Sequence, residues 1–139
     1  MYQHTVQYYE TDKMSITHHS NYVRWMEEAR VDYLKRLGYS LVRLEELGIV
    51  SPVVSLNCRY KKTTTFADVI RIDIKITEFK GVKLQLSYTF YNEKDEIVFT
   101  AQSEHCFITA EGRPLRLKKE FPDFYEALLS EYEKCAAQN

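Results

Sequence analysis

The chain has 139 residues and a formal net charge of −1, with 45% hydrophobic and 28% charged residues. This length suits a single domain with its own hydrophobic core, over residues 1–139. The near-neutral charge argues against a nucleic-acid binder, whose affinity depends on neutralising phosphates. No apolar run approaches the roughly 18 residues of a membrane span, and the N-terminus does not resemble a signal peptide. We therefore expect a cytoplasmic protein.

The cysteine and glycine content bears on metals and cofactors. Cys58, Cys106 and Cys135 are an odd and widely spaced set. They match neither a disulfide framework nor a zinc motif, so we expect reduced thiols. With 4 glycines, the chain has neither a GxGxxG fingerprint nor a P-loop. We expect no cofactor and no bound metal.

The first third of the chain predicts a strand, a loop and a long helix. Residues 2–9, YQHTVQYY, are rich in the strand-forming residues Tyr, Val and Thr. From Ser20 or Asn21 onward, apolar residues recur at helical spacing, and either residue would be a good N-cap. Gly38 is a suitable C-terminal stop for this helix.

The rest of the chain predicts a short helix, four strands and a closing helix. Within the second of these strands, isoleucines alternate with charged residues, which indicates a sheet with one buried face and one wet face. The simplest way to bury that face is to wrap the sheet around the long helix, so the predicted fold class is α+β. The predicted elements lie at 40–47, 53–62, 68–79, 82–91, 97–109 and 120–134.

Residues 9–25, YETDKMSITHHSNYVRW, gather many ionisable groups just before the long helix. The N–H groups at a helix start lack partners and carry positive potential, so they can polarise an acyl oxygen that becomes an oxyanion. Asp12 is close enough in sequence to fold back there, and its carboxylate is ionised at neutral pH. It can act as a general base on water or attack a carbonyl. His19 and the hydroxyl of Tyr22 are candidates for the same network.

Simpler explanations exist for each of these residues. Asp12 alone can be a turn residue, and Tyr22 at helical spacing can be part of the core. His18 and His19 are adjacent, so we expect their side chains to diverge. Together with Asp12 they suggest a metal site, but this is not a recognised ligand spacing. Glu10 is expected to point away from the candidate site.

The order of residues in this region resembles a known enzyme class, the acyl-CoA thioesterases of the 4-hydroxybenzoyl-CoA thioesterase class. The resemblance covers residues 2–109, and Asp68 also falls where that family often has an Asp. It rests on a strand ending in Tyr8-Tyr9-Glu10, then Thr11-Asp12, six further residues, His19, Asn21-Tyr22 and Trp25.

The resemblance implies a hotdog fold, in which an antiparallel sheet wraps around a long central helix. It implies that Asp12 is the catalytic carboxylate and that His19 opens the helix whose backbone N–H polarises the thioester carbonyl. We expect Tyr8 and Tyr22 to bind the substrate. The resemblance also implies a homodimer or homotetramer with its active site at the seam between subunits. The chain departs from the family in the loop after Asp12, which contains Met14-Ser15-Ile16 where family members often have a Gly.

Two functions remain open from the sequence. One is a thioesterase that hydrolyses an acyl-CoA, or an acyl group on a carrier protein, to a free acid and a thiol. The other is a non-hydrolytic hotdog protein that binds or transfers acyl groups. The presence of both Asp12 and His19 favours the enzyme, because a binding module has little use for a carboxylate beside an acyl carbonyl. Acyl chain length and aromatic or aliphatic preference stay undetermined.

Overall fold

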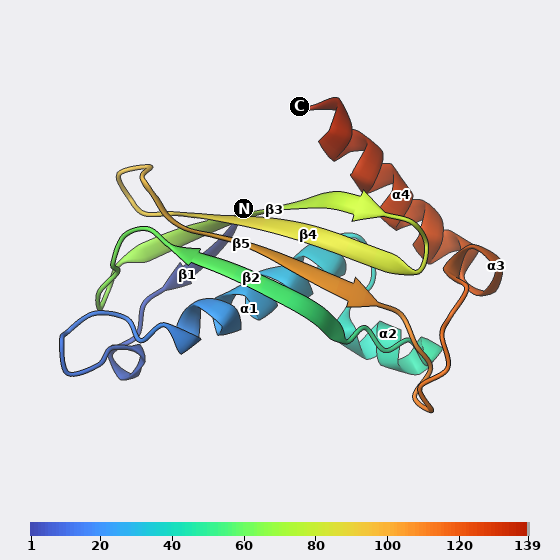
Figure 1. The fold of residues 1–139 in the computed structure, drawn as a ribbon, viewed down its shortest axis with the longest axis horizontal. Helices are drawn as coiled ribbons and strands as arrows, with labels where there is room; N and C mark the ends of the chain where they lie inside the picture. The colour runs from blue at the N-terminus through green and yellow to red at the C-terminus, as the bar shows by residue number, and fades with distance from the viewer. Residues whose placement is uncertain (139) are drawn as a thin grey trace. The chain divides into compact units, whose positions relative to one another are not determined.

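A computed structural model describes residues 1–138, and Figure 1 traces the path of the chain through its helices and strands. The N-terminal part contains β1 (Tyr2–Thr5), the 3-10 turn η1 (Tyr8–Glu10), α1 (Ser20–Arg36) and α2 (Leu41–Leu47). Four strands follow: β2 (Val53–Tyr60), β3 (Val69–Phe79), β4 (Lys83–Tyr91) and β5 (Ile97–Cys106). The short helix α3 (Leu117–Glu120) and the longer α4 (Pro122–Ala137) complete the chain.

The five strands form one sheet in the order β1-β3-β4-β5-β2. β1 runs antiparallel to β3, with Tyr2 opposite Ile72 and Thr5 opposite Val69. The strands β3, β4 and β5 neighbour one another in chain order, whereas β1 and β2 lie at the two edges. The predicted α+β class is confirmed.

The period-two pattern of the central strands correctly predicted which side chains are buried. β3 and β4 alternate strictly between buried and half-exposed residues along most of their length. Because successive side chains of a strand point to opposite faces, this alternation gives the sheet one apolar face. The predicted inward isoleucines of β3 are all buried, and β4 adds the buried Leu84, Leu86, Tyr88 and Phe90; the isoleucines are Ile70, Ile72, Ile74 and Ile76.

Packing divides the chain into two compact units. The first unit contains 1–33, 58–74 and 88–101, and the second contains 34–57, 75–87 and the residues from 102 onward. Each passage from one unit to the other lies within a regular element: α1, β2, β3, β4 or β5. Neither unit is therefore a contiguous segment of the sequence.

The core of the first unit is aromatic and joins the start of α1 to the sheet. Tyr22 and Trp25 of α1 are buried, as are Phe90 of β4 and Phe99 of β5. The ring centroids of Tyr22 and Phe99 lie 4.9 Å apart, and those of Trp25 and Phe90 lie 6.4 Å apart. Such pairs contribute about 0.5–1.5 kcal/mol beyond the burial of their area. The first turns of α1 therefore pack against β4 and β5 within the first unit.

The second unit contains α2 and α4, which correspond to the two shorter helices that the sequence predicted. Ser40 caps α2 by accepting a hydrogen bond from the Arg43 N–H, and Gly48 ends it with a φ of 76°. A glycine adopts this left-handed conformation without the clash that a Cβ would introduce. Phe124 of α4 packs against Tyr39, with ring centroids 4.5 Å apart.

Of the helices in residues 1–138, none combines the length and apolar character needed to cross a membrane.

The predicted first strand is too long. β1 stops at Thr5, and Tyr8–Glu10 form a 3-10 turn in place of a strand end. The reason is the buried carboxylate of Glu10, which accepts a hydrogen bond from the Gln7 N–H at 2.8 Å and so bends the chain back on itself. Tyr8 and Tyr9 are both exposed, at 72% and 82%, instead of alternating in and out.

Candidate active site

The loop that carries Asp12 is a closed turn between η1 and α1. Its ends meet at a bridge between Thr11 and Thr17. The Asp12 N–H donates to the Ile16 carbonyl, and the Met14 N–H donates to Asp12 Oδ1 at 2.8 Å. One carboxylate oxygen of Asp12 therefore stabilises the turn, as the simpler explanation of this residue predicted.

Threonines from the connection between β2 and β3 hold this loop from the other side. Thr17 donates its backbone N–H to the carbonyl of Thr64 at 2.8 Å, and the two hydroxyls lie 2.6 Å apart. Thr65 donates its hydroxyl to the Ser15 carbonyl at 2.7 Å. Thr17 and Thr64 are both buried. These bonds anchor the loop of Asp12 to the β2–β3 connection.

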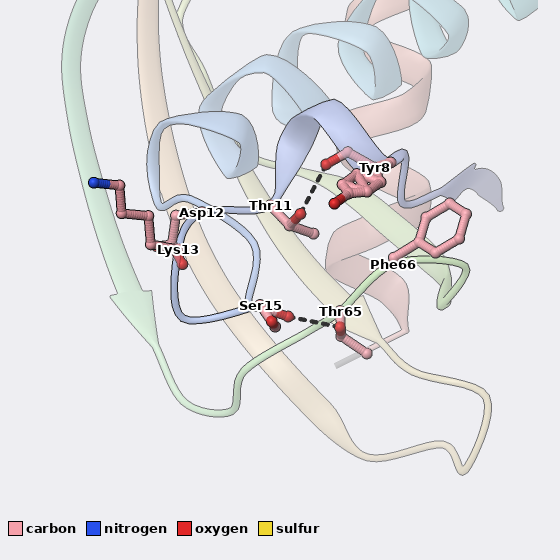
Figure 2. A pocket seen from close by; sticks show the side chains of 7 residues that line it. All are labelled: Tyr8, Thr11, Asp12, Lys13, Ser15, Thr65 and Phe66. Carbon is pink, nitrogen blue, oxygen red and sulfur yellow. Dashed lines mark hydrogen bonds between the residues drawn. The ribbon is translucent and has the colours of Figure 1, made fainter.

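Asp12 lies on the wall of a cavity of about 550 Å³. Figure 2 shows that the rings of Tyr8 and Phe66 lie next to each other on one side of it; their centroids are 5.8 Å apart. The cavity therefore combines a carboxylate with a pair of exposed aromatic rings. Its lining residues are Tyr8, Thr11, Asp12, Lys13, Ser15, Thr65 and Phe66.

His19 and Tyr22 lie on a second, smaller cavity of about 270 Å³. Its lining is Ile16, Thr17, His19, Tyr22, Tyr60, Lys61, Lys62 and Thr63. The predicted site residues are thus divided between two cavities of the first unit. Tyr8 shares one with Asp12, and Tyr22 shares the other with His19.

Tyr22 is mainly a core residue. It is 3% exposed, and its hydroxyl shares a hydrogen bond of 3.0 Å with the Thr64 hydroxyl. Burial raises the pKa of Tyr22, although the hydrogen bonds to Thr64 oppose this rise. The phenol therefore stays protonated at neutral pH and links α1 to the same Thr64 that holds the Asp12 loop.

The first turn of α1 differs from the expectation in two ways. Ser20 and Asn21 lie inside the helix, and neither caps it: the Ser20 hydroxyl and N–H both bond to the Nδ1 of His18. The rings of His18 and His19 do not diverge, because their centroids lie 4.3 Å apart with a tilt of 31°. Both residues lie just before the first residue of α1, Ser20. Tyr60 of β2 donates its hydroxyl to the His19 carbonyl at 3.1 Å.

Glu10 points away from the Asp12 cavity, into the core. It is 5% exposed, and its two carboxylate oxygens accept hydrogen bonds from His4 Nε2 at 2.8 Å and Trp25 Nε1 at 2.7 Å. Burial alone would raise the pKa of Glu10. The hydrogen bonds from the Gln7 N–H, His4 and Trp25 outweigh this effect and hold the pKa below its ordinary value. Glu10 is thus a buried, charged residue that stabilises the fold and does not line the Asp12 cavity.

Sequence reasoning missed the residues that support the site. Thr64 and Thr65 were not among the predicted site residues, and Glu10 was expected only to point away from the site. The run of three threonines at 63–65 was a usable signal, since side-chain hydroxyls in a loop often bond to nearby backbone.

Within residues 1–138, no cluster of three His, Cys, Asp or Glu side chains could hold a metal ion.

Comparison with known families now decides the class of protein. The model of the thioesterase-like superfamily matches residues 6–129, which is most of the chain. The chain belongs to the thioesterase-like superfamily. Its resemblance to this class of enzymes is therefore confirmed, and it is a thioester hydrolase with the α+β hotdog fold.

Individual relatives of this thioesterase-like protein agree with that assignment. It is 36% identical over 131 residues to the putative acyl-CoA thioesterase YneP of Bacillus subtilis, covering 94% of this chain and 92% of the relative. It is 30% identical to the 1,4-dihydroxy-2-naphthoyl-CoA hydrolase of Thermosynechococcus vestitus, covering 88% and 82%. The crystal structure of a DHNA-CoA thioesterase from Staphylococcus aureus matches with a TM-score of 0.91 at 33% identity, covering 99% and 92%.

Proposed function

We propose that this thioesterase hydrolyses an acyl-CoA to the free acid and CoA, with Asp12 as the general base or nucleophile. The observation that carries the proposal is the position of Asp12. Its carboxylate lies on the wall of a 550 Å³ cavity, in a loop that leads directly into α1. Asp12 Oδ1 is used by the Met14 N–H, so we assign the chemistry to the second carboxylate oxygen. In this mechanism the N–H of His19, at the start of α1, donates to the developing oxyanion.

The Asp12 carboxylate and the His19 N–H can hydrolyse a thioester by either of two routes. As a general base, the carboxylate takes a proton from water while the water oxygen attacks the thioester carbon. As a nucleophile, it forms an anhydride that water then hydrolyses. In either case the oxyanion collapses, the C–S bond breaks and the CoA thiolate leaves. The positive potential at a helix start stabilises the negative charge of the tetrahedral intermediate.

A substrate panel tests this proposal directly. Aliphatic and aromatic acyl-CoA thioesters, together with an acyl-carrier protein, are incubated with the protein, and the released thiol is measured with a thiol reagent. We expect release from at least one acyl-CoA at a rate far above that of the uncatalysed reaction. Release from the carrier protein alone, or from no thioester in the panel, would contradict the proposed substrate.

The side chain of His19 is expected to have a moderate effect. His19→Ala keeps the backbone N–H that we assign to the oxyanion, so activity should fall but persist, with a changed pH profile of kcat. A loss of roughly 10²-fold or more would instead indicate that the imidazole donates a proton or positions water. An enzyme indistinguishable from wild type between pH 5 and 9 would exclude the side chain from the mechanism.

We also propose that the active protein is a homodimer in which the β2 edges of two sheets join, and that dimers can pair into a tetramer. β2 has unpaired backbone along one side, and Val53, Val54 and Leu56 are all 43–55% exposed. An exposed apolar edge strand is a site for pairing with another chain. Light scattering should give at least twice the chain mass of 16.5 kDa.

A matched pair of variants tests where the subunits meet. Val54→Lys places a charge on the β2 edge, whereas Val82→Lys places one on an equally exposed valine in the β3–β4 turn. We expect only Val54→Lys to lower the mass in solution. A monomeric wild type at micromolar concentration, or two variants with the same mass as wild type, would contradict the proposed edge.

A further inference from the structure

The peptide bond between His18 and His19 carries the N–H that the proposed mechanism uses. Its carbonyl accepts two hydrogen bonds from one residue: the Asn21 N–H at 3.0 Å and the Asn21 side-chain Nδ2 at 3.3 Å. The chain has no cis peptide bond among its described residues. In a trans peptide the N–H points away from the carbonyl. Fixing the His18 carbonyl toward Asn21 therefore fixes the direction of the His19 N–H as well.

Asn21 is itself held firmly in place. It is 6% exposed, and its Nδ2 donates a second hydrogen bond to the Glu10 carbonyl at 3.0 Å. The same Glu10 carbonyl accepts the His18 N–H at 2.8 Å. The Glu10 side chain is tied to the core through Trp25 and His4. The side-chain amide of Asn21 thus connects the His18–His19 peptide to the buried Glu10.

We propose that Asn21 is a positioning residue for the reaction: its side-chain amide orients the His18–His19 peptide so that the His19 N–H meets the oxyanion. This inference rests on the proposed function. An oxyanion donor acts only when it lies about 2.7–3.1 Å from the oxygen, and removing one such donor costs roughly 10²–10³-fold in kcat. Losing the amide loosens the donor without deleting it, so a loss of roughly tenfold or more is expected.

The test compares Asn21→Ala with Asn92→Ala. Asn92 lies in the β4–β5 turn of the same unit, where its side-chain Oδ1 accepts hydrogen bonds from the backbone N–H groups of Lys94 and Glu96. Both variants lose amide-to-backbone bonds, but only the first concerns the His18–His19 peptide. We expect Asn21→Ala to lower kcat with KM nearly unchanged, because the interaction forms in the transition state. Asn92→Ala should keep the kcat of wild type.

A second variant gives a pH signature that a purely structural role would not produce. In Asn21→Asp the new carboxyl group faces the carbonyl oxygens of Glu10 and His18, so burial and repulsion favour its protonated form. Protonated, it can donate one hydrogen bond; ionised, it repels both carbonyls. The ratio of the kcat of Asn21→Asp to that of wild type should therefore rise as the pH falls. A ratio independent of pH would contradict the proposal.

The remaining outcomes separate this inference from the proposed function. If wild type hydrolyses acyl-CoA and folded Asn21→Ala has the same kcat, the positioning role is wrong and the proposed function stands. If wild type hydrolyses no thioester, the proposed function fails. The orientation is then tested by NMR, where Asn21→Ala should shift the amide signals of His18 and His19, whereas Asn92→Ala should not. Unchanged amide signals in Asn21→Ala would overturn the proposed orientation.

Discussion

Asp12→Asn will abolish nearly all thioesterase activity while leaving the protein folded. The amide oxygen can still accept the hydrogen bond that the Met14 N–H donates to Asp12 Oδ1, so the turn of residues 11–17 keeps its shape. The amide cannot take a proton from water or form an anhydride, so we expect turnover to fall by roughly 10²-fold or more. The measurement is kcat and KM on the best acyl-CoA of the panel, with the melting temperature as the folding check.

A second aspartate of the first unit supplies the control. Asp95 lies in the β4–β5 turn at a φ of 61°, a conformation that Asn also tolerates, and it pairs with Arg71. Asp95→Asn should therefore retain wild-type turnover. A folded Asp12→Asn enzyme that hydrolyses acyl-CoA at the wild-type rate would mean that the mechanism proposed for Asp12 is wrong.

Glu10→Ala will strongly destabilise the protein. The substitution leaves the Trp25 Nε1–H, His4 Nε2 and the Gln7 N–H without their acceptor, and Glu10 is 5% exposed. A buried donor without a partner costs about 1–3 kcal/mol, so we expect the free energy of unfolding to fall by about 3 kcal/mol or more. Denaturant unfolding measures this change. Glu96→Ala, which removes an exposed carboxylate paired with Lys62, should change the midpoint little.

The contribution of Glu10 also depends on pH in a defined direction. Its pKa is lower in the folded protein than in the unfolded chain, because hydrogen bonds to the charged form outweigh the effect of burial. The ionised form thus stabilises the fold, fully so above the ordinary pKa of a glutamate in the unfolded chain. The stability gap between wild type and Glu10→Gln should narrow as the pH falls through the folded pKa. A gap that widens on acidification would contradict this account.

Most of the secondary structure could be predicted because its signals are local. The alternation of Ile70 to Ile76 reports which face of β3 is buried, since a strand repeats every two residues. The short helix predicted at 40–47 is found as α2, Leu41–Leu47, and it ends at Gly48, where a glycine adopts the left-handed conformation freely. The 3-10 turn at Tyr8–Glu10 was not predicted, because the Glu10 carboxylate that bonds to the Gln7 N–H and closes the turn is also held in the core by Trp25, 15 residues away.

The sequence by itself determined the type of fold, the family and the candidate carboxylate. These depend on periodic patterns and on the order of a few residues before α1, which remain visible in one dimension. Only the tertiary structure decided how the loop of Asp12 is held. Thr17 and Thr64 are separated by 47 positions, and their bond exists only because folding brings the β2–β3 connection beside that loop. The tertiary structure also decided that Asp12 and His19 line two different cavities, since a cavity is defined by segments that meet through folding.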